Sequence, residues 1–485
     1  MERLRVRDPR DERAGARLPN VPADLDHTNA ESLDDFTWKE LMDGDACTKC
    51  GRCTDACPAD TVGRNLDPRN VILDLKSYRE SVSDDPVAGS GGGAVATDGG
   101  VASADGGLVP IVADEGGVID AESMESCMSC MACMDACPVD IEHLTSFTKM
   151  NRQLVDEGAV DSNLQGVFQD VMGKGNTFGE SQSTRGDWAD DLDDVDVPDA
   201  RETEVEYLWY VGDYPSFDDR NKKVARALAR LFDEADVSFG ILFDDEKTDG
   251  NDIRRIGEEF LYLELAGHHV ETFADCEFEN VVCTDPHSYN TIKNEYPEVD
   301  FAEFADDPMM PFDREEPWNA DGAVDVFHWT QVVEELVSEG RLGLSGDELD
   351  YTVTYHDPCH LGRYNDEYEA PRELIRATGA DLHEMPRSRD DSFCCGGGGG
   401  GLWMDHDEHT KPSEERLREA TEDTVRTPEQ FVVACPMCAT MYEDGRKTGG
   451  FEAALEIVDV SELVVEALDA RADAGTGGTT PATAD

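Results

Sequence analysis

Eight cysteines in two matching runs constrain the fold of this chain more than any other feature. Each run reads C-x2-C-x2-C-x3-C-P, a spacing in which three thiolates of one short loop reach three corners of a cubane iron–sulfur cluster. When two such runs occur together, the fourth thiolate of each run, just before proline, binds the other cluster. The pattern therefore predicts two ligand sets: Cys47, Cys50, Cys53 and Cys137 for a first cluster, and Cys127, Cys130, Cys133 and Cys57 for a second.

Zinc is the alternative metal at these cysteines, because tetrahedral sites of four thiolates also hold zinc. Zinc sites normally use C-x2-C pairs rather than a four-cysteine run that ends in proline, and here that run occurs twice. The spacing therefore favours iron–sulfur clusters. A disulfide framework is disfavoured, because thiols stay reduced in the cytoplasm.

Charge and hydropathy exclude several classes of protein. Asp and Glu number 108 against 41 Lys and Arg, and the net charge of −67 disfavours nucleic-acid binding, because phosphates would be repelled. Such an acidic surface is typical of a halophilic protein, since salt at 1 M screens charges within about 3 Å. No stretch approaches the roughly 18 apolar residues of a membrane span, and the Arg-rich segment Met1–Pro19 lacks the apolar core of a secretory signal. We therefore expect a cytoplasmic protein.

The pattern of apolar residues predicts an α+β multidomain protein. Helical spacing follows each cysteine run, whereas strands and helices alternate from about residue 204 onward, which is typical of α/β domains with a parallel sheet. We expect a disordered arm at 1–30, a helical domain at 31–157 with a Gly-rich insert at 81–117, an acidic linker at 158–203, an α/β domain at 204–300, an insert and connecting helix at 301–345, a second α/β domain at 346–465 and a disordered tail at 466–485.

A second group of cysteines lies in the C-terminal α/β domain: Cys359, Cys394, Cys395, Cys435 and Cys438. The adjacent Cys394 and Cys395 can face one cluster only if the backbone turns sharply, which the glycine run at 396–401 permits. Cys435 and Cys438 follow a predicted strand, where ligands bind in open α/β sheets. Five thiolates exceed the four of a tetrahedral zinc site, although zinc beside a flexible glycine loop stays the alternative.

Together these motifs resemble the heterodisulfide reductase D-type family, which includes glycolate oxidase iron–sulfur subunits. The resemblance spans about residues 36 to 465 and is carried by segments 48–58, 137–143 and 394–404. It implies an α-helical two-cluster [4Fe–4S] ferredoxin domain followed by two α/β cysteine-rich (CCG) domains. It also implies that the five C-terminal cysteines hold a non-cubane [4Fe–4S] cluster.

The first CCG copy departs from the family pattern. The family's cysteine positions are occupied by oxygen-bearing residues: Asp213, Thr248, Asp249, Asp285 and Ser288. Carboxylates and hydroxyls are poor ligands for iron–sulfur clusters compared with thiolates. We therefore predict a copy that has kept its fold and lost its cluster, with the remaining Cys276 and Cys283 packed as small hydrophobic residues.

The resemblance implies an iron–sulfur oxidoreductase that passes electrons between a flavoprotein dehydrogenase or electron-transfer flavoprotein and a quinone or thiol acceptor. Quinone would require a membrane partner, which would hold the chain peripherally at the membrane. Cys394 and Cys395 are predicted as the catalytic end, because the glycine run would let a small acceptor approach. His356 and His360 flank Cys359 and are candidates to bond a cluster sulfur or shuttle a proton, with a structural role as the alternative. The alternative functions are a heterodisulfide-type disulfide reductase and a non-catalytic metal-binding scaffold.

Overall fold

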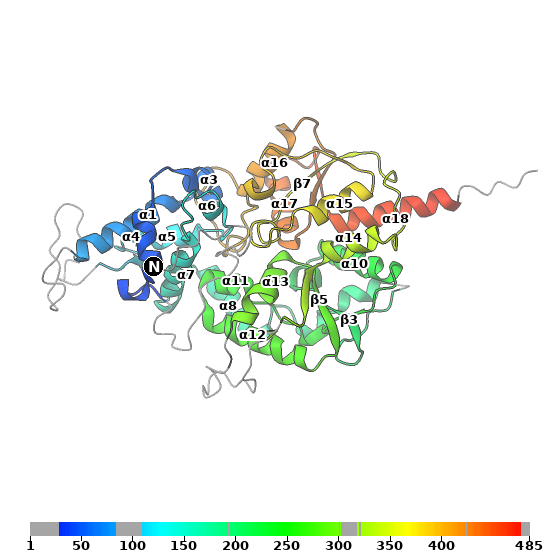
Figure 1. Cartoon of the computed structure of the whole chain (residues 1–485), viewed down its shortest axis with the longest axis horizontal. Coiled ribbons are helices and arrows are strands. Elements are labelled where there is room, and N and C mark those ends of the chain that lie inside the picture. Colours follow the sequence, from blue (N-terminus) through cyan, green and yellow to red (C-terminus); the bar gives the residue numbers. More distant parts are fainter. Residues whose placement is uncertain are drawn as a thin grey trace, which may run out of the picture.

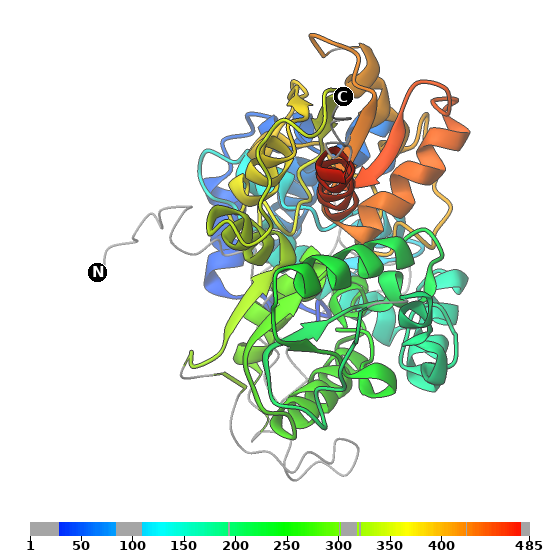
Figure 2. The same ribbon diagram turned by 90° about the vertical axis from the view of Figure 1, so that its right-hand side faces the viewer.

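The computed structural model describes residues 29–83, 109–192, 195–299, 301, 318–319, 322–422 and 424–476. A helical N-terminal unit lies beside two α/β units (Figure 1), and a side view shows the first α/β unit, in green, below the second, in yellow to red (Figure 2). The predicted α+β architecture is confirmed. Within the ranges given above, no helix combines the length and the apolar character that crossing a bilayer demands.

Short helices around the cysteine runs build the N-terminal unit. A capping box in which Thr37 and Glu40 bond each other's backbone N–H begins its first helix. The elements are α1 (Trp38–Ala46), α2 (Arg52–Asp55), α3 (Pro58–Val62), α4 (Pro68–Ser83), α5 (Ala121–Glu125), α6 (Ala132–Asp135) and α7 (His143–Asp156), with a small parallel pair of strands, β1 (Val112–Ala113) and β2 (Ile119–Asp120). Residues 1–28 of the predicted arm and most of the predicted Gly-rich insert lie outside the described residues.

The segment predicted as an acidic linker is largely structured, so that prediction is wrong. It contains α8 (Ser162–Lys174) and two 3-10 turns, η4 (Gln182–Thr184) and η5 (Asp187–Asp191). Leu164 and Phe168 of α8 pack in one cluster with Ile253 of the first α/β unit. The acidic composition masked this apolar stripe, which repeats at helical spacing.

The two α/β units share one topology. Each contains a four-stranded parallel sheet, with the orders β4-β3-β5-β6 and β8-β7-β9-β10. The strands are β3 (Val205–Tyr210), β4 (Phe239–Gly240), β5 (Phe278–Cys283) and β6 (Asp325–His328) in the first unit, and β7 (Thr352–Tyr355), β8 (Asp381–Leu382), β9 (Gln430–Val433) and β10 (Glu456–Asp459) in the second. The first unit therefore extends beyond residue 300, because β6 pairs with β5 in its sheet.

Helices cover both sheets and join them into one hydrophobic core. Trp209 and Trp329 of the first unit belong to the same buried cluster as Val458 of the second. The helices are α9 (Asp213–Phe217), α10 (Lys222–Glu234), α11 (Asn251–Ile256), α12 (Glu259–Ala274), α13 (Pro286–Asn290) and α14 (Trp329–Ser338) in the first unit, and α15 (Glu369–Ala377), α16 (Pro412–Glu422), α17 (Pro436–Thr448) and α18 (Val460–Thr476) in the second. Because α18 extends to Thr476, the disordered tail predicted from 466 is wrong for its first part, and 477–485 lie outside the described residues.

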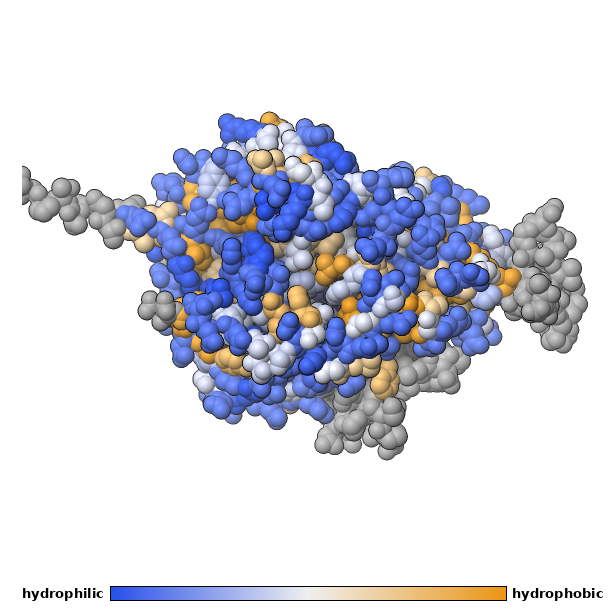
Figure 3. All heavy atoms as spheres, turned by 180° about the vertical axis from the view of Figure 1, so that it is seen from behind, coloured by the Kyte–Doolittle hydropathy of each residue, from blue (hydrophilic) through white to orange (hydrophobic). Residues whose placement is uncertain are grey.

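We expect the folded state to require molar salt. Acidic residues outnumber basic ones by 108 to 41, and hydrophilic residues dominate the face shown in Figure 3. Dilution from 1 M to 0.01 M lengthens the Debye length from about 3 Å to about 30 Å, which restores repulsion among the acidic side chains. Circular dichroism should therefore lose its helical signal on dilution and regain it when salt returns. An unchanged spectrum at low salt would contradict this expectation.

Candidate functional site

Four cysteines drawn from both runs surround one small cavity near the surface of the helical unit. Cys47, Cys50, Cys53 and Cys137 line it, in the grouping predicted for the first cluster. Cys50 is exposed and Cys53 is buried, while the other two are partly exposed. Burial raises the pKa of Cys53 to about 11, so a bound metal would have to supply the charge that keeps this thiol ionised.

The other four cysteines line a second cavity deeper in the same unit. Cys57, Cys127, Cys130 and Cys133 are all buried, and apolar side chains such as Met131 complete the lining. Burial holds the pKa of the Cys133 thiol well above its usual range. Four thiols around one cavity with an apolar lining fit a cluster that is held by thiolates and shielded from solvent.

The two cysteine loops have the same backbone shape. Lys49 and Ser129 occupy matching positions and have φ of 57° and 48°, and Gly51 and Met131 match with 84° and 64°. Side chains other than glycine rarely adopt this left-handed region. Its use at three non-glycine positions shows that the loops hold a constrained shape, in which the first three thiols of each run line one cavity.

The five C-terminal cysteines form one connected group. The Cys438 and Cys395 sulfurs are 3.4 Å apart, and Cys394 lies within hydrogen-bonding reach of both Cys359 and Cys395. Cys435 ends the loop after β9, and its sulfur accepts the Cys438 backbone N–H at 3.4 Å. Hydrogen bonds from Cys394 and Cys438 hold the pKa of Cys395 well below its usual range. The five thiols lie on two loops and at the start of α17. This set of donors fits a thiolate-held cluster.

The C-terminal group adjoins the buried cavity of the helical unit. The Cys130 and Cys394 thiols lie within hydrogen-bonding reach of each other, and this contact and burial raise the pKa of Cys130 well above its usual range. Arg363 donates to the carbonyl oxygen of Cys130 at 2.6 Å, and the Tyr364 hydroxyl donates to that of Ser129 at 2.6 Å. The thiols of the buried cavity and those of the C-terminal group are therefore in direct contact. The sequence motifs did not reveal this arrangement.

The glycine run packs against the helical unit rather than facing an open space. A Cβ on Gly399 would lie 2.1 Å from the Cys127 carbonyl oxygen, and one on Gly398 would lie 2.7 Å from that of Met128. All six glycines of 396–401 are buried. The prediction that a small acceptor approaches through this run is therefore wrong. Among the five C-terminal cysteines, only Cys359 is partly exposed.

Replacing Gly399 by Ala is expected to lower the free energy of unfolding by more than about 1 kcal/mol. The new Cβ would overlap the Cys127 carbonyl, and φ at Gly399 is +63°. Gly166→Ala is the matched control, because this site in α8 has nothing within 4 Å of a Cβ and alanine favours a helix. Thermal unfolding of the metal-loaded chain measures both. Equal midpoints for the two variants would show that the glycine run does not require this close approach.

Comparison with known proteins gives two domain matches. Residues 46–142 match the family described as "4Fe-4S dicluster domain", and residues 353–443 match the family described as "Cysteine-rich domain". Over most of the chain, "Probable iron-sulfur-binding oxidoreductase FadF" of Bacillus subtilis is 34% identical, covering 90% of this chain and 62% of that protein. "EtfAB:quinone oxidoreductase" of Syntrophomonas wolfei is 32% identical, with 90% and 60% covered. One subunit of the "Dihydromethanophenazine:CoB--CoM heterodisulfide reductase" of Methanosarcina acetivorans is 26% identical, with 89% and 96% covered.

Most of this chain is similar to these iron–sulfur proteins, and it carries a 4Fe-4S dicluster domain and a cysteine-rich (CCG) domain. The resemblance inferred from the cysteine motifs is thereby confirmed, and the second α/β unit is a CCG domain. The chain spans about three fifths of the length of the first two relatives, and nearly all of the heterodisulfide reductase subunit.

The first α/β unit, which shares the topology of the CCG domain, has polar contacts at the positions where the resemblance implies cysteines. Asp213 pairs with Arg185 at 2.6 Å, and Asp249 accepts the Ser288 hydroxyl at 2.5 Å. Burial raises the pKa of Asp249 to about 6. Both carboxylates therefore have polar partners among the protein's own side chains. Of the two spare cysteines, Cys283 is buried in the core as predicted, whereas Cys276 is only partly buried at the edge of the core and its thiol donates to the Thr272 carbonyl oxygen.

One predicted histidine contact is present and another is absent. His360 Nδ1 lies 3.4 Å from Cys359 Sγ, so this imidazole does contact a sulfur of the C-terminal group. His356 instead contacts the Tyr442 hydroxyl, at 3.1 Å. A third histidine, His287 of the first CCG copy, was not predicted and lies beside Cys435. The sequence feature that could have pointed to His287 is its place between Asp285 and Ser288, two positions where the resemblance implies cysteines.

Proposed function

We propose that the chain passes electrons between a flavoprotein and an acceptor along three thiolate-held iron–sulfur clusters. The observation that carries this proposal is the contact between Cys130 and Cys394, which joins the thiols of the buried cavity to those of the CCG domain. Bound clusters would supply one-electron chemistry, and the protein would set their spacing and surroundings.

The proposed ligands are the three groups of thiols described above. They are Cys47, Cys50, Cys53 and Cys137 for one [4Fe–4S] cubane, Cys57, Cys127, Cys130 and Cys133 for a second, and Cys359, Cys394, Cys395, Cys435 and Cys438 for a non-cubane [4Fe–4S] cluster. The first CCG copy holds none, because its Asp213 and Asp249 already bond to Arg185 and Ser288.

The different exposure of the three thiol groups supports one order in which electrons pass through them. Electrons exchange with the flavoprotein at the surface group, where Cys50 is exposed, and cross the fully buried second group. They reach the acceptor at the CCG domain, on the side of the partly exposed Cys359. In this arrangement the buried thiols serve as a relay, because solvent and substrates cannot reach them.

The relatives' names support the proposed partners. One relative is named for an electron-transfer flavoprotein and quinone, which supports an electron-transfer flavoprotein or a flavoprotein dehydrogenase as the donor and quinone as the acceptor. Another is named "Probable membrane-anchored ferredoxin", which supports peripheral contact with a membrane partner. Disulfide reduction is the second candidate, because the chain covers 96% of a heterodisulfide reductase subunit.

The test is a two-stage anaerobic mixing experiment followed by visible absorbance. Reduced electron-transfer flavoprotein should bleach the iron–sulfur absorbance of the chain, and a soluble quinone analogue should restore it. Recovery with a small-molecule disulfide and not with quinone would favour the second candidate. A colourless chain would contradict both, and zinc in that chain would identify a zinc scaffold, because zinc has no redox chemistry.

A further inference from the structure

We propose that Asp285 and His287 of the first CCG copy set the reduction potential of the cluster on the second copy, through Cys435. The inference rests on the proposed function, since it requires a cluster at Cys435. It gives the copy that has lost its thiolates a part in the electron path, which is to tune the site of the copy that has kept them.

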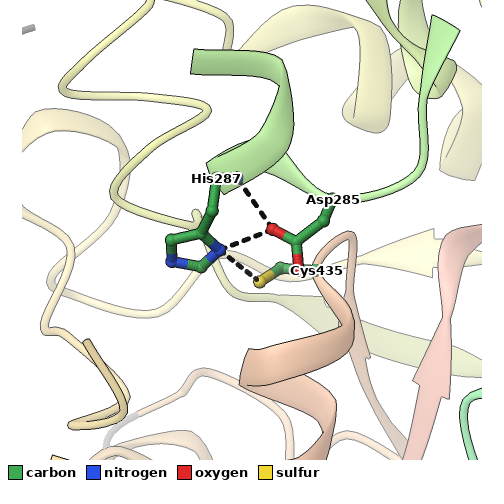
Figure 4. Close-up of side chains that lie close together, drawn as sticks. All are labelled: Asp285, His287 and Cys435. Atoms are coloured by element: carbon green, nitrogen blue, oxygen red, sulfur yellow. Dashed lines mark hydrogen bonds and ion pairs between the residues drawn. The ribbon is translucent and has the colours of Figure 1, made fainter. Parts of the chain in front are cut away.

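The internal duplication places these residues opposite Cys435. Asp285 follows β5 and begins α13, just as Cys435 follows β9 and begins α17. The two turns read Asp-Pro-His-Ser and Cys-Pro-Met-Cys, so Asp285 and His287 stand where the second copy has Cys435 and Met437. Figure 4 shows the turn of the first copy presenting both side chains to the Cys435 sulfur.

The contacts are short and buried. His287 Nδ1 lies 2.5 Å from Asp285 Oδ1 and 3.9 Å from Cys435 Sγ, and all three residues are at most 6% exposed. The His360 ring lies 4.2 Å from the His287 ring, and His360 itself contacts Cys359. Two neighbouring imidazoles, one from each CCG copy, therefore connect two of the five thiols.

A separate metal ion on Asp285, His287 and Cys435 is disfavoured by this geometry. Their side chains are all ligand types that zinc accepts, and their ligand atoms lie within 4.8 Å of one another. However, Nδ1 and Oδ1 are 2.5 Å apart and share a hydrogen bond, whereas two ligands of one tetrahedral zinc lie about 3.3 Å apart. The trio is arranged as a hydrogen-bonded pair beside a thiolate.

The two side chains act on the cluster in opposite directions. Reduction adds negative charge, so an N–H directed at a ligand sulfur stabilises the reduced form and raises the potential. The Asp285 carboxylate destabilises the reduced form by repulsion and draws the same N–H away from Cys435. Loss of the imidazole should therefore lower the potential, and loss of the carboxylate charge should raise it.

The experiment is an anaerobic redox titration of the full, cluster-loaded chain, followed by electron paramagnetic resonance. Asp285→Asn should raise the potential of the C-terminal cluster and His287→Leu should lower it, each by at least tenfold in the redox equilibrium constant, about 59 mV for one electron. His287→Asn keeps a donor near Nδ1 and should stay near the native value. His269→Gln is the matched control, because this imidazole is also buried in the first copy but contacts Tyr296.

Shifts of the same sign in Asp285→Asn and His287→Leu, or shifts no larger than that of the control, would overturn the inference. Loss of a metal other than iron from His287→Leu would also overturn it, by showing that the trio binds a separate ion. A native chain without a third cluster signal would overturn the proposed function together with the inference. Three native signals with unshifted variants would overturn the inference alone.

Discussion

Replacing Cys395 by Ser is expected to abolish electron delivery to the acceptor while both ferredoxin cubanes stay reducible by dithionite. Cys395 lies at the centre of the C-terminal group, 3.4 Å from the Cys438 sulfur and in contact with Cys394. A serine hydroxyl is a harder and poorer ligand for iron–sulfur clusters than a thiolate. Because even outer-shell changes at metal sites cost 10–100-fold, we expect turnover to fall by more than about 100-fold.

The control for this variant is Cys276→Ser, which removes a thiol that contacts only the Thr272 carbonyl oxygen among the bonds described for it. It should retain full turnover with the same acceptor. Cys395 is preferred to Cys394 for this test, because Cys394 also contacts Cys130 of the neighbouring group. Full acceptor turnover in Cys395→Ser would show that the ferredoxin domain alone delivers the electrons.

Replacing Cys133 by Ser is expected to interrupt the path in its middle. Cys133 is 7% exposed and lines the buried cavity between the surface group and the CCG domain. Without the second cluster, the reduced flavoprotein should still reduce the surface cluster, but reduction of the C-terminal cluster should slow by more than about 100-fold. Stopped-flow absorbance separates the two phases.

The control for the interrupted path is direct chemical reduction. Dithionite should still reduce the C-terminal cluster of Cys133→Ser, because its five thiols are unchanged. If the flavoprotein reduced that cluster at the native rate, electrons would enter at the CCG domain and the proposed direction through the ferredoxin domain would be wrong.

Local spacing made the cysteine groups predictable. In the runs that begin at Cys47 and Cys127, the first three thiols are so close in sequence that the backbone brings them together, and the structure groups them accordingly. Secondary structure is harder to predict where no glycine or proline separates two adjoining elements. Residues 326–339 contain no glycine or proline, so their spacing predicts one continuous helix where the structure has β6 followed by α14.

Long-range contacts could not be predicted from the sequence. The glycine run permits close approach, but nothing in residues 396–401 indicates that Cys127 and Met128, over 260 positions earlier, are the approaching partner. The place of His287 beside Cys435 likewise depends on how the two CCG copies pack, because 148 positions separate the residues. The acidic composition of residues 158–203 also led to the wrong prediction of a linker, because it concealed the apolar face of α8.

Anaerobic analysis of iron and acid-labile sulfide per chain tests the central claim most directly. Three four-iron clusters predict about 12 iron atoms and an equal amount of sulfide in the native chain, and about eight of each in Cys395→Ser. A native value near eight would show that the CCG domain is empty, and a value near 16 would show that the first copy also holds a cluster. Either result would contradict a path of three clusters that ends at the C-terminal thiols.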